Sequence, residues 1–282
     1  MSEKLLSRTM TDLSMSGKSP GTCATYLACI KQLYAYVDKP LSRLTREDIV
    51  EFMRYETTER RLSPSSLRLI AVAIRFFCTV TLGRARLVEG LKAQRVTPKP
   101  VTVLSVVEAD KLISSIESPT HYAVASVLYG TGMRLSEALA ITVDDIQADR
   151  GVISVPHSKT RQARVARLSV ELVSRLRSYW RFRRPQSKLL FHGLDPSKPM
   201  DQTGVQHAIR AAAQAAGLRQ RVTPHVLRHT HATHLLESGV DLFTVQKLLG
   251  HACIESMLCY LNVSTAHLSG KRIELPPLLQ PR

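Results

Sequence analysis

The sequence predicts a mainly α-helical protein of two domains, an α+β chain in which one small β-hairpin interrupts the helices. Three observations predict this fold class. Apolar residues recur with a helical period along most of the 282 residues. The period changes to that of strands only around 152–168. A linker is indicated at 92–100, because this stretch has two prolines, three basic residues and few apolar side chains.

The first domain, residues 1–97, is expected to be a compact helical bundle. Two acidic residues follow Thr45, and acidic side chains stabilise the positive end of a helix. Ser63 and Pro64 have the residue types preferred at an N-cap and at the first helical position. The helical segments predicted in this domain are 4–15, 22–37, one that starts after Thr45, and one from Ser63 to Gly83.

The second domain, residues 98–282, is expected to begin with a helix at about 105–117. Ser105 and Glu108 have the spacing of a capping box, which marks a helix start. The apolar tail after Asn262 is broken by prolines, so we expect it to dock on another surface, such as a neighbouring subunit. The elements predicted in between are helices at 120–129 and 133–141 around a turn at 130–132, strands at 152–155 and 165–168, and helices at 169–183, 203–216, 224–238, 242–249 and 253–261.

The charge of the chain points to a polyanionic partner. It has 39 Lys and Arg residues against 23 Asp and Glu residues, a net charge of +16. Residues 1–100 hold 17 basic and 9 acidic residues, so half of the excess lies in each part of the chain. Such a spread suits a protein that surrounds a polyanion, although a basic surface without a specific partner remains an alternative. No segment combines a basic face with a strong apolar face, so a membrane partner is not expected.

The remaining global features favour a cytoplasmic protein. The five cysteines form no Cys-x-x-Cys pair, which is typical of reduced thiols in the cytosol. The N-terminus lacks the apolar core of a signal peptide, and no stretch approaches 18 apolar residues. The sequence contains no Walker glycine loop and no Gly-x-Ser-x-Gly elbow. It also has no pair of carboxylates placed for two-metal catalysis, so we expect no cofactor and no metal.

Arg134 and Lys159 are the first two candidate catalytic residues. Arg134 follows the predicted glycine turn and is expected in the first turn of a helix, where free N–H groups favour a phosphate. Glu137, three residues on, is placed to support Arg134, although an exposed ion pair of little consequence fits equally well. Lys159 lies in the loop between the two strands, where it would donate a proton to a leaving oxygen. A solvated basic loop is the alternative.

His225 and Arg228 share one face near the start of a predicted helix, because they are three residues apart. Thr223 and Pro224 fit the N-cap and the first helical position there, so both side chains would point at one anion. A metal site is the alternative, since histidines are dense in this helix. That alternative lacks the carboxylate of a zinc helix, and its ligands would be His225, His229, His231 and His234.

His251 and Tyr260 complete the set. His251 follows Gly250, a natural helix end, and Tyr260 lies nine residues later. A phenol with an ordinary pKa of about 10 is a poor nucleophile, but neighbouring arginines would stabilise its phenolate. By itself Tyr260 fits core packing, and residues 239–261 fit a helix-turn-helix of a DNA-binding regulator.

Taken together, these residues resemble the tyrosine recombinases of the phage integrase family. The order and spacing of His-x-x-Arg, Gly-His and Tyr carry most of the resemblance. The matching stretches are Gly130-Thr-Gly-Met-Arg-Leu-Ser-Glu137, the hairpin lysine, His225-Val-Leu-Arg228, Leu249-Gly-His251 and Tyr260.

The resemblance implies a helical core-binding domain followed by a tyrosine-recombinase catalytic domain, as in the short two-domain Xer-like group. In such enzymes a tyrosine attacks the phosphate and forms a 3′-phosphotyrosine, and strand exchange passes through a four-way junction. It also implies four protomers on two DNA sites with inverted repeats, with a related recombinase or accessory protein as a further partner, at the bacterial nucleoid. The implied roles are phosphate binding by Arg134, His225, Arg228 and His251, support by Glu137, proton donation by Lys159, and attack by Tyr260.

One departure from the family pattern concerns the hairpin. The loop around Lys159 lacks the Gly-Lys-Gly form, so Arg161 and Arg164 are the basic alternatives for the proton donor. Two other activities stay open from the sequence. A type IB topoisomerase would use the same chemistry on one duplex, and a DNA-binding regulator would use none of it.

Overall fold

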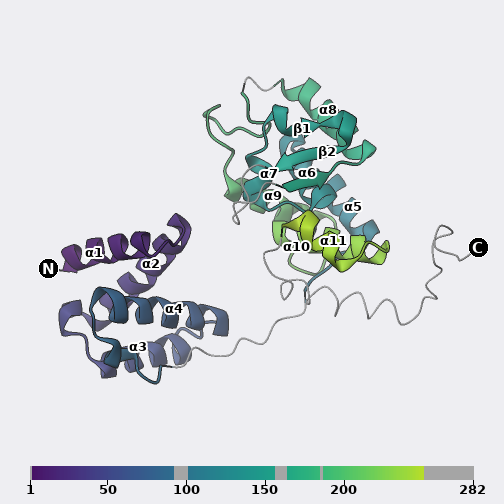
Figure 1. Ribbon diagram of the computed structural model, residues 1–282. Helices are drawn as coiled ribbons and strands as arrows, with labels where there is room; N and C mark the ends of the chain where they lie inside the picture. Colours follow the sequence, from purple (N-terminus) through teal and green to yellow (C-terminus); the bar gives the residue numbers. More distant parts are fainter. Residues whose placement is uncertain (1, 92–100, 156–163, 185–186, 251–282) are drawn as a thin grey trace, which may run out of the picture. The chain divides into compact units, whose positions relative to one another are not determined.

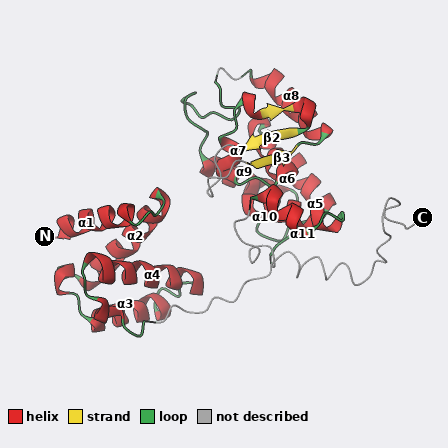
Figure 2. Ribbon diagram, viewed as in Figure 1, coloured by secondary structure: helices red, strands yellow, loops and turns green. Residues whose placement is uncertain are grey.

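The computed structural model describes residues 2–91, 101–155, 164–184 and 187–250 (Figure 1). The chain divides into two compact units, Met1–Pro98 and Lys99–Arg282. Both units are mainly helical, and the second contains a small antiparallel sheet (Figure 2). The predicted fold class is confirmed.

The described residues of unit 1 form a bundle of four α-helices, and the sequence predicted all four. Thr45 caps α3 reciprocally: its hydroxyl accepts from the Asp48 backbone N–H, and the Asp48 carboxylate accepts from Thr45 N at 2.7 Å. Ser63 caps α4, which continues through a π-helical turn, Phe77–Thr81. The helices are α1 (Ser2–Met15), α2 (Pro20–Val37), α3 (Arg46–Thr58) and α4 (Pro64–Phe76), with 3-10 turns at Leu41–Arg43 and Ala85–Val88.

The run Pro64–Thr81 is the single helix among the described residues that is long and apolar enough to cross a membrane. It has 18 residues with a mean hydropathy of 1.3, although the sequence predicted no such span. However, Ile74 and Phe77 in this run are fully buried in the core of unit 1. A buried core helix has the same length and composition, so the run is weak evidence for a membrane span.

Unit 2 surrounds α6 with other helices. Positions 123–128 of α6 are all buried, and α5, α8, α9 and α10 contact this helix. A helix that is apolar on every side belongs in the centre of a fold. The helices are α5 (Val106–Ser114), α6 (Pro119–Thr131), α7 (Leu135–Leu139), α8 (Val170–Arg183), α9 (Gln202–Ala215), α10 (Pro224–Glu237) and α11 (Leu242–Leu249), with 3-10 turns at Val143–Asp145 and Ala148–Arg150.

The sheet of unit 2 has three antiparallel strands in the order β1-β2-β3. The strands are β1 (Ile146–Gln147), β2 (Val152–Val155) and β3 (Arg164–Arg167). The central pair sets Ile153 opposite Ala166, and both side chains are buried. The sequence predicted β2 and β3 but missed β1, because two residues are too few to show a strand period.

The predicted glycine turn at 130–132 is wrong in its extent. Helix α6 runs through Thr131, and only Gly132 leaves the helix, with a φ of +64°. Arg134 is the N-cap of the short helix α7 and does not lie in its first turn. Burial of positions 123–128 in the core stabilises α6, and the helix extends past the predicted start of the turn. The predicted helix at 253–261 and the tail lie outside the described residues.

Gly132 is expected to tolerate no side chain. A Cβ there would lie 2.5 Å from Leu249 Cδ2 and 2.6 Å from His231 Cδ2. Gly132→Ala should therefore lower the free energy of unfolding by about 3 kcal/mol, as overpacking and the left-handed backbone both oppose it. Gly217→Ala is the matched control, because Gly217 has a φ of +70° with nothing within 4 Å of such a Cβ.

The measurement is urea unfolding followed by the fluorescence of the single tryptophan, which lies in α8 of unit 2. The control should lose about 1 kcal/mol, the cost of the left-handed conformation alone. Equal losses in the two variants would contradict the close approach of α10 and α11 to Gly132.

Candidate active site

Arg228 is a buried arginine near the start of α10. The Thr223 hydroxyl accepts from Val226 N at 3.4 Å and caps the helix, as predicted. Arg228 is 4% exposed, and its guanidinium donates to Gly132 O at 2.6 Å and to Leu249 O at 2.8 Å. A buried cation needs such partners, because losing water costs several kcal/mol. Arg228 therefore joins α10 to the ends of α6 and α11.

Arg134 is held by Glu137 through two contacts. Its backbone N–H donates to Glu137 Oε2 at 2.9 Å, and its guanidinium donates to Oε1 at 2.7 Å. The Glu137 side chain is 4% exposed, whereas that of Arg134 is 27% exposed. A weaker contact runs from Arg134 Nη2 to Gly250 O at 3.4 Å. The pair is therefore built into the fold, unlike the surface ion pair considered from the sequence.

Arg164 is a third arginine in this cluster. It opens β3, and its side chain is 7% exposed. Its guanidinium donates to Glu137 Oε2 at 2.6 Å and also to Leu248 O. The sequence considered Arg164 as a proton donor, but the structure places it in a buried ion pair. The sequence did contain a sign of this burial. Side chains two residues apart in a strand lie on the same face, and Ala166, two residues after Arg164, is buried.

The three arginines converge on the end of α11. A helix C-terminus exposes carbonyl groups without intrahelical partners and has a partial negative charge. Three successive carbonyls there accept from three different guanidinium groups. The pairs are Leu248 O with Arg164, Leu249 O with Arg228, and Gly250 O with Arg134.

The Glu137 carboxylate is charged in this cluster. Burial alone would raise its pKa, but the Arg134 backbone N–H and the charges of Arg164 and Arg134 outweigh burial and hold the pKa below its usual range. Two guanidinium groups therefore contact one carboxylate, and the third, that of Arg228, binds the same helix end. The surplus of positive charge suits an anion such as a phosphate.

His225, His229 and His231 of α10 favour their neutral forms. The pKa of His225 is also lowered. The larger cause is that part of its side chain is covered, and the charges of Arg228 and Arg134 lower the pKa further. Burial lowers the pKa of His229 to about 4, and His231 behaves in the same way. At neutral pH these rings therefore act as hydrogen-bonding groups without adding charge.

His234 has a structural role on the same helix. Its Nε2 lies 3.0 Å from Leu104 O, and its Nδ1 lies 3.0 Å from the Tyr129 hydroxyl. A carbonyl only accepts, so Nε2 carries a proton and, in the neutral ring, Nδ1 accepts from Tyr129. The Thr230 hydroxyl accepts from Leu104 N at 3.1 Å.

Within the ranges that the structure describes, no three His, Cys, Asp or Glu side chains are grouped to hold a metal.

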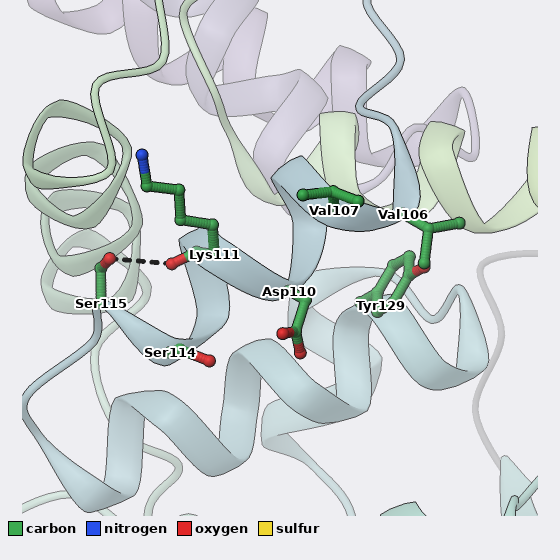
Figure 3. A pocket seen from close by; sticks show the side chains of 7 residues that line it. All are labelled: Val106, Val107, Asp110, Lys111, Ser114, Ser115 and Tyr129. Carbon is green, nitrogen blue, oxygen red and sulfur yellow. Dashed lines mark hydrogen bonds between the residues drawn. The ribbon is translucent and has the colours of Figure 1, made fainter.

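A depression of about 620 Å³ lies elsewhere in unit 2, between α5 and the end of α6 (Figure 3). Tyr129 reaches it from α6, and the exposed Val106 and Val107 form part of its wall. None of the predicted site residues lines it. The size of this depression is therefore a poor guide to the site in this protein.

Several predicted residues lie outside the described part of the chain. They are Lys159, Arg161, His251 and Tyr260. The structure brings together Arg134, Glu137, Arg228 and His225, and it adds Arg164 in a role that the sequence had not assigned.

Two models of protein families match the sequence of the chain. Residues 102–267 match the phage integrase family, and residues 5–86 match the N-terminal SAM-like domain of phage integrases. This chain belongs to the phage integrase family. The predicted resemblance is confirmed, and both units correspond to parts of the family architecture.

Relatives of this integrase extend over nearly its whole length. The putative integrase/recombinase y4qK of Sinorhizobium fredii (strain NBRC 101917 / NGR234) is 34% identical over 262 residues, covering 93% of this chain and 85% of the relative. Tyrosine recombinase XerD of Listeria monocytogenes serotype 4b (strain F2365) is 30% identical over 272 residues, covering 89% and 91%. The chain is thus an enzyme of the tyrosine recombinase type.

A solved structure shares the fold. The lambda integrase tetramer bound to a Holliday junction matches with a TM-score of 0.73 and 20% identity, covering 89% of this chain and 74% of that chain. Site-specific recombination is the activity that the family and its named members support.

The half-buried histidines of α10 should make the integrase sensitive to acid. Unfolded His231 binds a proton near the ordinary histidine pKa of 6.5, whereas burial lowers the pKa of the folded form to about 4. The unfolded state therefore holds more protons between these values, and the free energy of unfolding falls as the pH falls. This histidine alone should cost about 2 kcal/mol between pH 7 and 5.

The measurement is urea unfolding by Trp180 fluorescence across this pH range. His231→Phe removes the titrating group while keeping a flat ring, so its unfolding free energy should depend less steeply on pH. A slope as steep as that of the unmodified protein would show that His231 is already charged, or exposed, in the folded state.

Proposed function

We propose that this integrase cleaves and rejoins DNA at a specific site through a covalent bond to Tyr260. The convergence of Arg134 and Arg228 beside the end of α11, with His225 on the same helix as Arg228, carries the proposal. Two guanidinium groups there can share the oxygens of one phosphate. Family membership supports a tyrosine as the nucleophile.

In the proposed first step Tyr260 loses its phenolic proton to solvent, and the phenolate oxygen attacks the scissile phosphorus. The bond from phosphorus to the 5′ oxygen breaks, and Lys159 gives that oxygen its proton. The DNA strand is then held as a 3′-phosphotyrosine ester. Arg134 and Arg228, with His225 and His251, stabilise the negative charge that grows on the phosphoryl oxygens. Each of these roles is a proposal on this chain's own residues.

The second step reverses the first with a 5′ hydroxyl from a partner strand. The hydroxyl gives its proton to Lys159, which the first step left neutral, and its oxygen attacks the phosphotyrosine. The bond from phosphorus to the Tyr260 oxygen breaks, and the phenolate takes a proton from solvent. Because the ester conserves the energy of the DNA linkage, neither ATP nor a cofactor has to supply it. Exchange of strands between two duplexes then gives a four-way junction, and the comparison with lambda integrase, a tetramer on a Holliday junction, supports this proposal.

The proposed assembly is a homotetramer on two double-stranded sites with inverted repeats, in the bacterial cytoplasm. Residues 1–97 would bind one side of the duplex and residues 98–282 the other. The excess of basic residues in both parts of the sequence supports this division. A related recombinase or accessory protein would complete the assembly, and the tail after Asn262 would dock on a neighbouring subunit.

The test is trapping on a nicked suicide substrate. Duplexes taken from the DNA that adjoins the gene should give a covalent protein–DNA band that persists in EDTA. Tyr260→Phe should abolish the band, because the attacking oxygen is lost. Tyr122→Phe should keep it, since Tyr122 packs beside Arg175 on α8, away from the arginine cluster.

Other outcomes assign the protein differently. A band that survives Tyr260→Phe would place the nucleophile elsewhere. No band on any fragment that the protein binds would favour a DNA-binding regulator. Relaxation of supercoiled DNA without dependence on a site would favour a topoisomerase of type IB.

A further inference from the structure

We propose that Arg164 is a positioning residue that balances the charge of Glu137 and so leaves the guanidinium of Arg134 free to attract the DNA phosphate. The proposal rests on the proposed function, because it takes Arg134 as a phosphate-binding group. Nothing in the motif pattern required this role: Arg164 was a candidate only for the transfer of a proton.

The first argument is the geometry of the Glu137 carboxylate. Its Oε1 accepts from Arg134 at 2.7 Å, and its Oε2 accepts from Arg164 at 2.6 Å. The two oxygens are thus divided between two cations. If Arg164 were absent, the buried carboxylate would have a single cationic partner among these contacts. Arg134 and Glu137 would then approach a neutral pair, with little charge left for a phosphate.

The second argument is the difference in exposure between the two arginines. The Arg164 side chain is 7% exposed, whereas that of Arg134 is 27% exposed. Arg134 is therefore the more open of the two cations that share the Glu137 carboxylate. The cluster therefore separates two tasks, since one cation satisfies the buried carboxylate and another stays accessible.

The third argument is the tie between Arg164 and the end of α11. Its guanidinium also donates to Leu248 O, two residues before the C-cap. A Cβ on Gly250 would lie 2.7 Å from Arg164 Cδ and 2.8 Å from its Nε, so the Arg164 side chain packs directly against the end of α11. Gly250 has a φ of +65°, which allows the helix to end there. Arg164 thus links Glu137 to the end of α11. The predicted site residue His251 is the next residue in the sequence after this helix end.

The experiment is a double-mutant cycle on the full chain with the suicide substrate. Arg164→Met keeps much of the side-chain volume and removes the charge. Cleavage under single-turnover conditions should slow by about 10- to 100-fold, the usual loss when a supporting group is removed. Affinity for the same duplex in a gel shift should change by less than about threefold, because many contacts to the phosphate backbone share the binding of a duplex.

The decisive variant adds Glu137→Gln to Arg164→Met. If Arg164 acts by balancing charge, the double variant should cleave about tenfold faster than Arg164→Met, because the unbalanced carboxylate is gone. This gain is expected even though the ion pair of Glu137 with Arg134 is also lost. A purely structural role predicts the opposite, a further loss. A double variant slower than Arg164→Met would therefore overturn the proposal.

Two controls make the outcome specific. Arg167→Met alters an exposed arginine on the same strand and should cleave at the unmodified rate. Trp180 fluorescence shows whether unit 2 is folded in each variant. If Arg164→Met does not fold, Arg164→Gln takes its place in the cycle, because a glutamine also removes the charge while its amide can still donate a hydrogen bond.

The result also separates this proposal from the proposed function. If the unmodified integrase gives no covalent band, or Tyr260→Phe keeps one, the proposed function fails. If both behave as expected and Arg164→Met cleaves at the unmodified rate, only the role of Arg164 is refuted.

Discussion

The free carbonyls at the end of α11 are the feature on which the candidate site depends. A helix end has acceptors without intrahelical donors, and its partial negative charge attracts cations. In this integrase three arginines supply the donors, from the N-cap of α7, from β3 and from α10. Elements distant in the sequence therefore meet at one helix terminus. Two of the cations that complete this terminus, Arg134 and Arg228, are also the candidates for binding a DNA phosphate.

Close packing at two glycines makes this meeting possible. Gly132 brings the end of α6 under Leu249 and His231, and its carbonyl accepts from Arg228. Gly250 lets the side chain of Arg164 pass beneath α11. At both positions the backbone has a positive φ, and the neighbouring side chains leave no space for a Cβ. Backbone groups thus approach the arginines closely enough to replace the water that burial removes.

Helix α10 connects this cluster to the start of unit 2. One end of the helix presents His225 and Arg228, and its later turns bind both backbone groups of Leu104 through Thr230 and His234. Tyr129 supports His234 from α6. The segment by which the chain enters unit 2 is therefore fixed to the helix that carries two predicted phosphate-binding residues. His229 and His231 on this helix are half-buried and favour the neutral form, so they do not add to the charge of the arginines.

The sequence by itself determined the helix starts, because a cap joins residues that are only three positions apart. Thr45, Ser105 and Thr223 were predicted as caps or helix starts, and the structure confirms them. Residue types at family spacing also indicated a phosphate site with Arg134 and Arg228. The two-residue strand β1 and the full length of α6 were missed, since their stability comes from packing and not from local pattern.

Only the tertiary structure decided how the charged residues of unit 2 divide their roles. Arg164 contacts Glu137 across 27 positions and Leu248 across 84, and Arg228 reaches Gly132 across 96. No local pattern reports contacts at such separations. Whether an arginine is buried as a counter-ion or left open to an anion depends on what packs over it. That covering is set by the whole fold, while the residue's own neighbours in the sequence set only its secondary structure.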